Sequence, residues 1–237
     1  MKSPTSSMLG MAHPLQNLIV CILLVFASVG CARLNPGGVS PTRWKVTYDH
    51  TLSADFFNQD QHSLPWNIVE HDDGSLEDTL GGSTKNIPRL RHTADCTSSY
   101  LGDHSIRFAE AWIEADGVGG IYVHDFTAST NDHLLIIVKN RRFSVHYWTH
   151  HIISNENPTW RVLSASIVLD GPLVTVGQTL RGFIDVQLVG TSPNGGHRTN
   201  RIRGYIKPQV SMNPPDEVRS DEAVNQALQQ TAEVTIP

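Results

Sequence analysis

Short stretches in which apolar and polar residues alternate dominate the chain from position 105 to position 206. A period of two is typical of strands with one buried face, and the enrichment in Ile, Val, Tyr and Trp also favours strands. The pattern predicts strands over residues 105–115, 121–126, 133–139, 142–153, 161–169, 173–176, 179–189 and 200–206. Turn residues separate these strands roughly every 8–12 positions, which predicts an all-β protein, either a sandwich or a barrel.

The flanking segments carry weaker patterns. Residues 44–48 alternate and predict one more strand, whereas 53–91 is rich in turn clusters. No helical period occurs between Trp44 and Pro208, so we place the sandwich domain at 44–210. The remaining segment, 211–237, has a thin apolar stripe and is either a short helix or a tail.

The N-terminal part of the chain predicts export. Residues 18–29 form an apolar run of about 12 positions, whereas a membrane-spanning helix needs roughly 20. A run of this length followed by small residues is typical of a signal peptide. We therefore interpret residues 1–31 as a leader and 32–43, with its Pro and Gly residues, as a linker.

The end of the leader allows three interpretations. Ser28-Val29-Gly30-Cys31 resembles the lipobox of bacterial lipoproteins, which implies that Cys31 carries a lipid at the new N-terminus. Alternatively, cleavage near Ala32 gives a secreted protein, or the leader stays uncleaved as a signal anchor. Each of the three predicts an extracytoplasmic protein, and the first predicts a cell-envelope lipoprotein attached to the membrane by its lipid.

The cysteines do not form a disulfide framework. Cys21 leaves with the leader, and Cys96 is a single thiol if Cys31 is lipidated. Otherwise Cys31 and Cys96 can pair. In either case the domain depends on its hydrophobic core for stability.

Composition and charge narrow the function classes. Hydrophobic residues make up 39% of the chain and charged residues 17%, as is ordinary for a sandwich. The net charge is -5 and there is no basic stripe, so we do not expect nucleic acid as a partner.

A hairpin within 133–153 gives the most specific structural prediction. Asn140 tolerates the positive φ of a type I′ turn, so Asn140-Arg141 forms a two-residue turn that pairs Val138 with Phe143. The register then places six residues on one face, which is a core: Leu134, Ile136, Val138, Phe143, Val145 and Tyr147. A slip of one residue would exchange the two faces.

The second face of this hairpin holds the candidate ligand-binding residues: Trp148, His146, His133, Ser144 and His150. An indole ring stacks on the apolar face of a sugar, and imidazole and hydroxyl groups bond to its hydroxyls. Two alternatives remain open, because this face also suits packing under a loop or helix, or simple solvation.

A family resemblance supports the sandwich. The residues that carry it are Gly119-Gly120-Ile121-Tyr122-Val123, the segment 131–138 and Asn140-Arg141-Arg142-Phe143-Ser144-Val145. This strand–loop–strand–turn–strand pattern resembles the laminin-G/concanavalin-like jelly rolls over about 30 residues. The resemblance implies an antiparallel β-sandwich of jelly-roll type that is mostly a binding module, with polysaccharide-cleaving enzymes on the same fold.

Metal-binding patterns are weak. His146 and His150 would lie about 13 Å apart on one strand, so they cannot share an ion. His133 and His146 are diagonal neighbours and would need a third ligand, and no zinc motif is present. The acidic turn 70–78 offers oxygen ligands for calcium without EF-hand spacing, so calcium is the one cofactor that we keep open, against an ordinary surface turn.

Catalytic motifs are weaker still, and we predict no catalytic residue. Glu110, Glu114 and Asp116 are the only candidates for paired carboxylates, and Tyr147 faces the core. We therefore expect a non-catalytic carbohydrate-binding module. The alternatives are a polysaccharide-active lyase or glycoside hydrolase on the same fold, and a structural envelope lipoprotein without a ligand.

Overall fold

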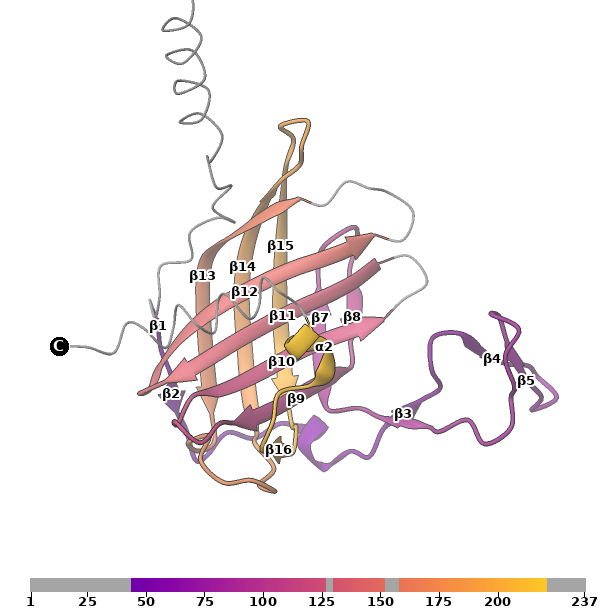
Figure 1. Ribbon diagram of the computed structural model, residues 1–237, viewed down its shortest axis with the longest axis horizontal. Helices are drawn as coiled ribbons and strands as arrows, with labels where there is room; N and C mark the ends of the chain where they lie inside the picture. Colours follow the sequence, from indigo (N-terminus) through magenta and orange to yellow (C-terminus); the bar gives the residue numbers. More distant parts are fainter. Residues whose placement is uncertain (1–43, 127–129, 152–157, 221–237) are drawn as a thin grey trace, which may run out of the picture. The chain divides into compact units, whose positions relative to one another are not determined.

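The computed structural model describes residues 44–126, 130–151 and 158–220 (Figure 1). The predicted leader and linker lie outside these residues. In the described part, almost all regular structure is β-strand, and the two helical elements are the 3-10 turn η1 (Asp55–Asn58) and the short helix α2 (Asp216–Ser220). The predicted all-β fold is therefore confirmed, and the described part of 211–237 contains a short helix, one of the two forms predicted for this segment.

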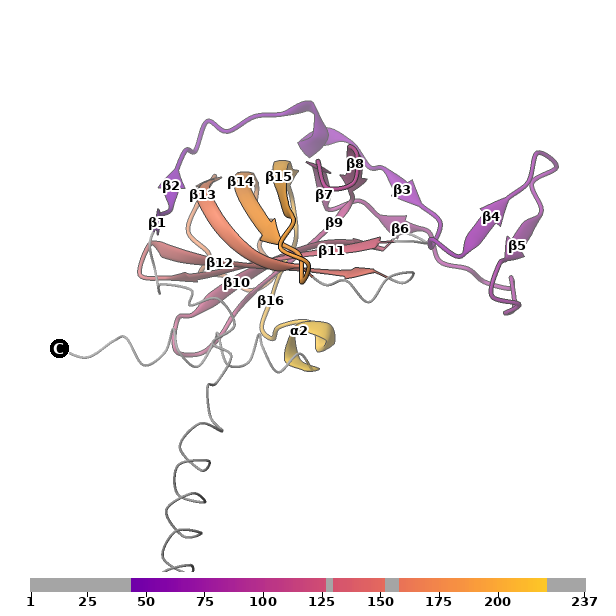
Figure 2. The same cartoon turned by 90° about the horizontal axis from the view of Figure 1, so that it is seen from above.

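Two six-stranded sheets form the sandwich (Figures 1 and 2). Sheet A contains, in spatial order, β1 (Trp44–Lys45), β12 (Arg142–His151), β11 (Thr130–Lys139), β10 (Gly119–Phe126), β9 (Phe108–Ile113) and β16 (Val210–Ser211). Sheet B contains β2 (Thr47–Tyr48), β13 (Thr159–Leu169), β14 (Gly182–Thr191), β15 (His197–Ile206), β7 (Ala94–Ser98) and β8 (His104–Ile106).

The long strands are joined as antiparallel meanders. Strands β9 to β12 follow one another in sheet A, and β13 to β15 do so in sheet B, where β7 pairs with β15. Jelly rolls are built from Greek-key connections instead. The predicted antiparallel sandwich is thus present, with a simpler strand order than a jelly roll has.

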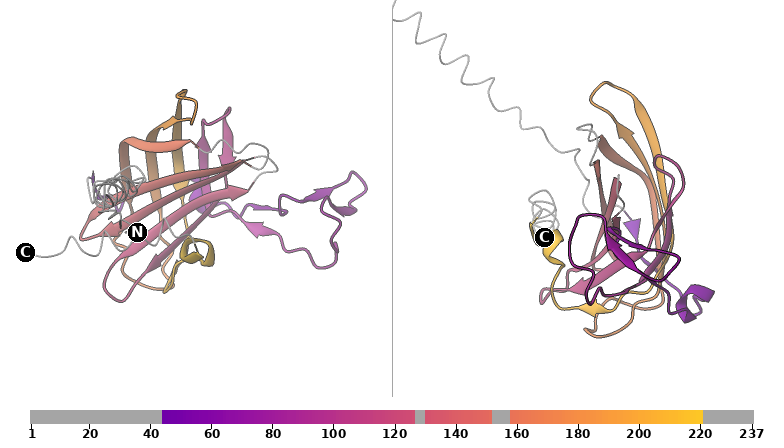
Figure 3. Two further views of the ribbon diagram at one scale, coloured as in Figure 1. Left: turned by 45° about the horizontal axis from the view of Figure 1, so that its top comes forward. Right: turned by 90° about the vertical axis from the view of Figure 1, so that its right-hand side faces the viewer.

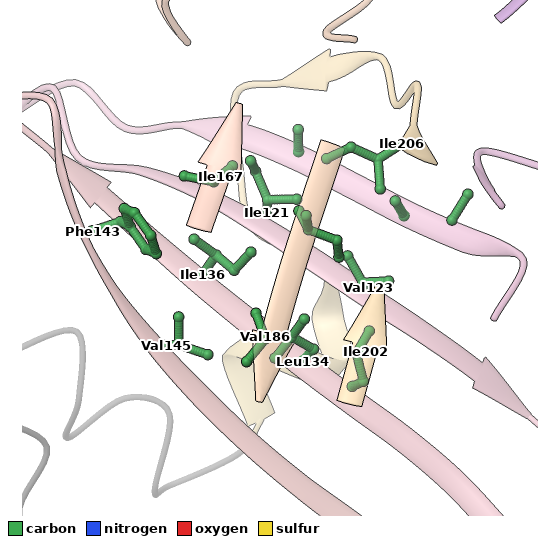
Figure 4. Close-up of a cluster of buried hydrophobic side chains, with 14 of the residues drawn as sticks. Ile121, Val123, Leu134, Ile136, Phe143, Val145, Ile167, Val186, Ile202 and Ile206 are labelled. Atoms are coloured by element: carbon green, nitrogen blue, oxygen red, sulfur yellow. The ribbon is translucent and has the colours of Figure 1, made fainter. Parts of the chain in front are cut away.

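The core lies between the two sheets. Figure 4 shows Ile121, Ile136 and Val145 of sheet A packed toward Ile167, Val186 and Ile202 of sheet B, all fully buried or nearly so. Each fully buried aliphatic side chain contributes about 1.5–3 kcal/mol. Cys96 is a free thiol within this core, and burial raises its pKa far above the usual range. The core therefore holds the described domain together without a disulfide.

The β11–β12 hairpin has the predicted register. Asn140 and Arg141 both have positive φ, 52° and 62°, as a type I′ turn requires. Val138 pairs with Phe143 and His133 with Trp148. All six residues predicted for the apolar face belong to the sandwich core.

Residues 44–48 divide between the two sheets. The first half, β1, pairs with β12, and the second half, β2, pairs with β13 in parallel. Val46 lies between them in the core, and its backbone N–H donates to the carbonyl of Arg141. The single strand that we predicted therefore crosses from one sheet to the other.

Residues 173–176 were predicted to form a strand and do not. Leu173 is buried, but Val174 and Val176 are exposed and no neighbouring strand pairs with the segment. Gly171-Pro172 and Gly177 bound it closely, so the chain turns before a ladder can form.

The segment predicted to be loops, 53–91, contains two small two-stranded sheets. One pairs β3 (His62–Ser63) with β6 (Leu90–Arg91), and the other pairs β4 (Ile68–Glu70) with β5 (Leu76–Asp78). These strands of two or three residues are too short to show a period in the sequence.

Candidate functional site

The outer face of sheet A, which points away from sheet B, carries a ladder of parallel rings. His133 on β11 and its cross-strand partner Trp148 on β12 stack with centroids 5.1 Å apart and planes 5° apart. Tyr122 on β10 stacks on His124 at 4.5 Å and lies parallel to His133 at 5.9 Å. We call these four residues the aromatic ladder. Its rings support one another, so His133 fixes the orientation of the Trp148 indole.

Part of this face is closed by α2. A second small core contains Trp112, Val118, Tyr122, Leu135, Ile137 and Val218, with Trp148 packed against it. Val218 belongs to α2, which lies on the outer side of sheet A (Figures 2 and 3). The Tyr122 hydroxyl also donates to Oε2 of Glu217 on the same helix, at 3.3 Å. Over β10 and β11, this face therefore packs under a helix, which is one of the alternatives given above.

Three predicted site residues follow one another on the outer face of β12. Ser144 is buried, and His146 and Trp148 are half-buried. Burial disfavours the charged imidazolium and lowers the pKa of His146 to about 4, so this ring is neutral at physiological pH. The backbone of His150 continues the strand opposite Asn131.

Two of these side chains have buried polar atoms without a hydrogen-bond partner in the structure. They are Oγ of Ser144 and Nε2 of His146, two residues apart on the same face. A buried polar group that lacks a partner costs about 1–3 kcal/mol. The outer side of β12 therefore holds a hydroxyl and a neutral imidazole, each with a buried polar atom, beside an indole ring.

The turn end of the β11–β12 hairpin carries several cations and borders a hollow. Lys45 of β1, Arg142 of β12 and Lys139 of β11 occupy directly opposed positions, and we call them the cationic row. A hollow of about 400 Å³ is lined by Lys45, Val46, Asn140, Arg141 and Arg142. Arg142, which helps to line the hollow, lies two residues before Ser144 on β12.

An inner polar cluster lies between the sheets at the other end of the hairpin. Asp132 accepts a hydrogen bond from the Tyr147 hydroxyl through Oδ1 and pairs with Nε2 of His104 through Oδ2. Nδ2 of Asn200 donates to the Tyr147 oxygen at 2.8 Å. The bond to Asp132 raises the pKa of His104, and burial raises the pKa of Tyr147 well above its usual range.

A second carboxylate stands directly opposite the first. Asp125 of β10 is the cross-strand partner of Asp132, and Arg107 donates to it from Nε at 2.7 Å and from Nη2 at 2.9 Å. Two buried carboxylates, a tyrosine and a histidine therefore meet here, a combination that the sequence analysis did not find. The sequence held one signal, since both aspartates occupy apolar-face positions of their strands.

The other candidates lie apart from these sites. Glu110 bonds to Nε2 of His124 at 3.2 Å, and Asp116 accepts from the Val118 N–H in the turn that follows β9. In the acidic turn, Asp73 accepts from Ser75, and Glu70 pairs with Arg89.

Within 44–126, 130–151 and 158–220, no three His, Cys, Asp or Glu side chains converge as a metal site requires. No helix in these same ranges is long and apolar enough to cross a membrane.

Comparisons with known proteins found no relative. No protein-family model, no curated protein and no solved structure matches this chain. The functional argument therefore depends on the geometry alone.

Proposed function

We propose that this protein is an exported, non-catalytic module that binds carbohydrate along the outer face of β12. The observation that carries the proposal is the adjacent pair of unpaired buried atoms, Oγ of Ser144 and Nε2 of His146, beside the half-buried Trp148. Proteins seldom leave buried polar groups unpaired unless a water, an ion or a function accounts for them.

The chemistry of the three side chains suits a sugar. A hydroxyl and a neutral imidazole can each donate or accept, and sugar hydroxyls do the same. The indole offers an apolar surface of the kind on which pyranose rings stack. His133 acts as a positioning residue, because it holds the Trp148 ring from one side by stacking.

Export and a place at the cell envelope belong to the same proposal. The apolar run 18–29 and the lipobox-like Ser28-Val29-Gly30-Cys31 support it, with 32–43 as a tether between anchor and domain. Cys96 is a buried free thiol that hydrogen-bonds to the Tyr205 carbonyl, so Cys31 is not required as its partner.

The enzyme alternative has less support. The two carboxylates that meet in the inner polar cluster, Asp125 and Asp132, are 2% and 1% exposed. Each is already engaged, one by Arg107 and the other by His104 and Tyr147. A general acid and a base must exchange protons with the substrate, and both carboxylates are already held in ion pairs and hydrogen bonds with groups of the protein.

The test combines binding with stability. The full chain and its Ser144→Ala variant are titrated calorimetrically against a panel of neutral and acidic polysaccharides. Because the hydroxyl of Ser144 is unpaired, we expect the variant to unfold with equal or higher free energy, yet to bind roughly 10-fold more weakly.

Ser98→Ala is the matched control. The Ser98 hydroxyl is equally buried, but it donates to Oδ1 of Asn200 at 3.2 Å. Its removal should lower stability by about 1 kcal/mol and leave affinity unchanged. A panel without a single bound polysaccharide, or wild-type affinity in Ser144→Ala, would overturn the proposed function.

A further inference from the structure

We infer that the carbohydrate bound along β12 is acidic, and that its sulfate or carboxylate groups are held by the cationic row Lys45, Arg142 and Lys139. This inference rests on the proposed function, since it concerns the same strand face. It adds the charge class of the ligand and a second set of contacting residues.

The position of the row is the first argument. Arg142 lies two residues before Ser144 on β12 and points to the same face. Its partners on either side are Lys45 of β1 and Lys139 of β11. A chain of sugar units that follows β12 past Trp148 and His146 therefore arrives at three positive charges.

The electrostatics are the second argument. Like charges directly opposite one another on neighbouring strands destabilise a sheet. Among the residues that the structure describes, no carboxylate makes a salt bridge with Lys45, Lys139 or Arg142. The whole chain is acidic, with a net charge of -5. A bound anion would relieve the repulsion that this protein otherwise maintains.

The turn supplies the third argument. Arg141 has φ 62°, at a turn position where glycine is preferred, yet the chain places a fourth cation there. Its guanidinium lies 5.1 Å over the ring of Tyr48, beside the hollow.

The size of the hollow agrees with one charged sugar unit. Its volume of about 400 Å³ lies within the range of small-ligand sites. The planar guanidinium of Arg142 can bond a carboxylate or sulfate through two parallel N–H donors, whereas the lysines supply point charges.

The experiment uses two matched pairs of polymers. Dextran sulfate is compared with dextran, and polygalacturonate with its methyl ester, so that each pair differs only in charged groups and the pairs separate sulfate from carboxylate. We expect at least one acidic member to bind roughly 10-fold or more tightly than its neutral partner at low salt, with the preference reduced at high salt.

Variants of the row give the decisive comparison. The triple variant Lys45→Gln, Lys139→Gln, Arg142→Gln should lose the preference for the acidic member and keep any binding of the neutral one. The control triple variant Lys85→Gln, Arg161→Gln, Arg198→Gln removes the same charge from exposed positions elsewhere. It should retain the preference.

Each outcome separates the two proposals. Equal binding of acidic and neutral polymers, or equal losses in both triple variants, would overturn this inference and leave the proposed function standing. Acidic binding that depends on the row but is unaffected by Ser144→Ala would overturn the proposed carbohydrate site along β12. In that case the row would be a plain anion site.

Discussion

Tyr147 and Asp132 lie on neighbouring strands of sheet A and are hydrogen-bonded through their side chains inside the sandwich. The ring of Tyr147 belongs to the apolar core row of the hairpin, and its hydroxyl reaches the buried carboxylate one step further along β11. Tyrosine suits this position because it is apolar along its ring and polar at its tip. The pair marks the border between the hydrophobic core and the inner polar cluster.

Removing the charge of Asp132 should weaken the domain. In Asp132→Asn, His104 loses the carboxylate that raises its pKa, and the Tyr147 hydroxyl loses its charged acceptor. We expect the free energy of unfolding to fall by about 3–5 kcal/mol, as for other broken buried pairs. The pKa of His104, followed by NMR, should fall toward 6.5.

The control for this variant is Asp185→Asn. Asp185 pairs with Arg201 on the outer face of sheet B, where the arginine is half-exposed. Its loss should cost about 1 kcal/mol or less and leave the pKa of His104 unchanged. Equal losses in the two variants would contradict the role assigned to the inner polar cluster.

His146 should make stability depend on pH in a defined window. Its pKa is lowered by burial from 6.5 to about 4, so below pH 6.5 the unfolded chain binds a proton that the folded chain does not. Stability must therefore fall as the pH drops from 6.5 toward 4, by on the order of 3 kcal/mol from this group. Urea unfolding of the wild type and of His146→Gln across this range measures the difference.

Subtracting the free energy of unfolding of His146→Gln from that of the wild type separates the effect of His146 from that of carboxylates that titrate in the same pH range. This difference should decrease steadily as the pH drops from 6.5 to 4, and a constant difference would refute the prediction. His104 acts in the opposite sense, because its pKa is raised. Its contribution is complete below pH 6.5 and is lost as the pH rises through the raised pKa.

Position 120 should not tolerate a residue larger than glycine. A Cβ at this position would lie 2.0 Å from Cζ2 of the fully buried Trp112. Gly120→Ala should displace the indole from the small core under α2, lower the free energy of unfolding by about 1–3 kcal/mol and change the tryptophan fluorescence.

Gly171→Ala is the comparison variant for Gly120→Ala. There the nearest atom to the added Cβ is Nε2 of Gln178 at 3.8 Å, an ordinary contact. We expect no change in fluorescence and a small change in stability. The same fluorescence change in both variants would show that Trp112 does not depend on Gly120.

The hairpin could be predicted because its determinants are local. A period of two and an Asn at the turn set the register, and the register sets both faces, from Leu134 to Tyr147. The inner polar cluster could not be predicted in the same way. Asp132 contacts His104 directly, and the Tyr147 hydroxyl links it to Asn200. Both partners lie far from Asp132 in the sequence. Their pairing depends on how the two sheets stack.

The covering of the outer face is also nonlocal. Val218 is one apolar residue in a weak stripe, and nothing in its neighbours indicates that it packs with Trp112 and Tyr122. The local pattern therefore identified which residues share the outer face of β12, but the part of the outer face of sheet A that α2 covers had to come from the fold.

The crossing segment 44–48 has a consequence for the aggregation of the protein after proteolysis. It occupies one edge of each sheet, beside β12 and beside β13. Exposed strand edges recruit other chains and begin aggregation. A protease that removed these five residues would uncover the parts of β12 and β13 that they pair with, Arg142 and Phe143 in one sheet and Val168 and Leu169 in the other. We therefore expect nicked preparations to form assemblies while their circular dichroism spectra still show folded sheets.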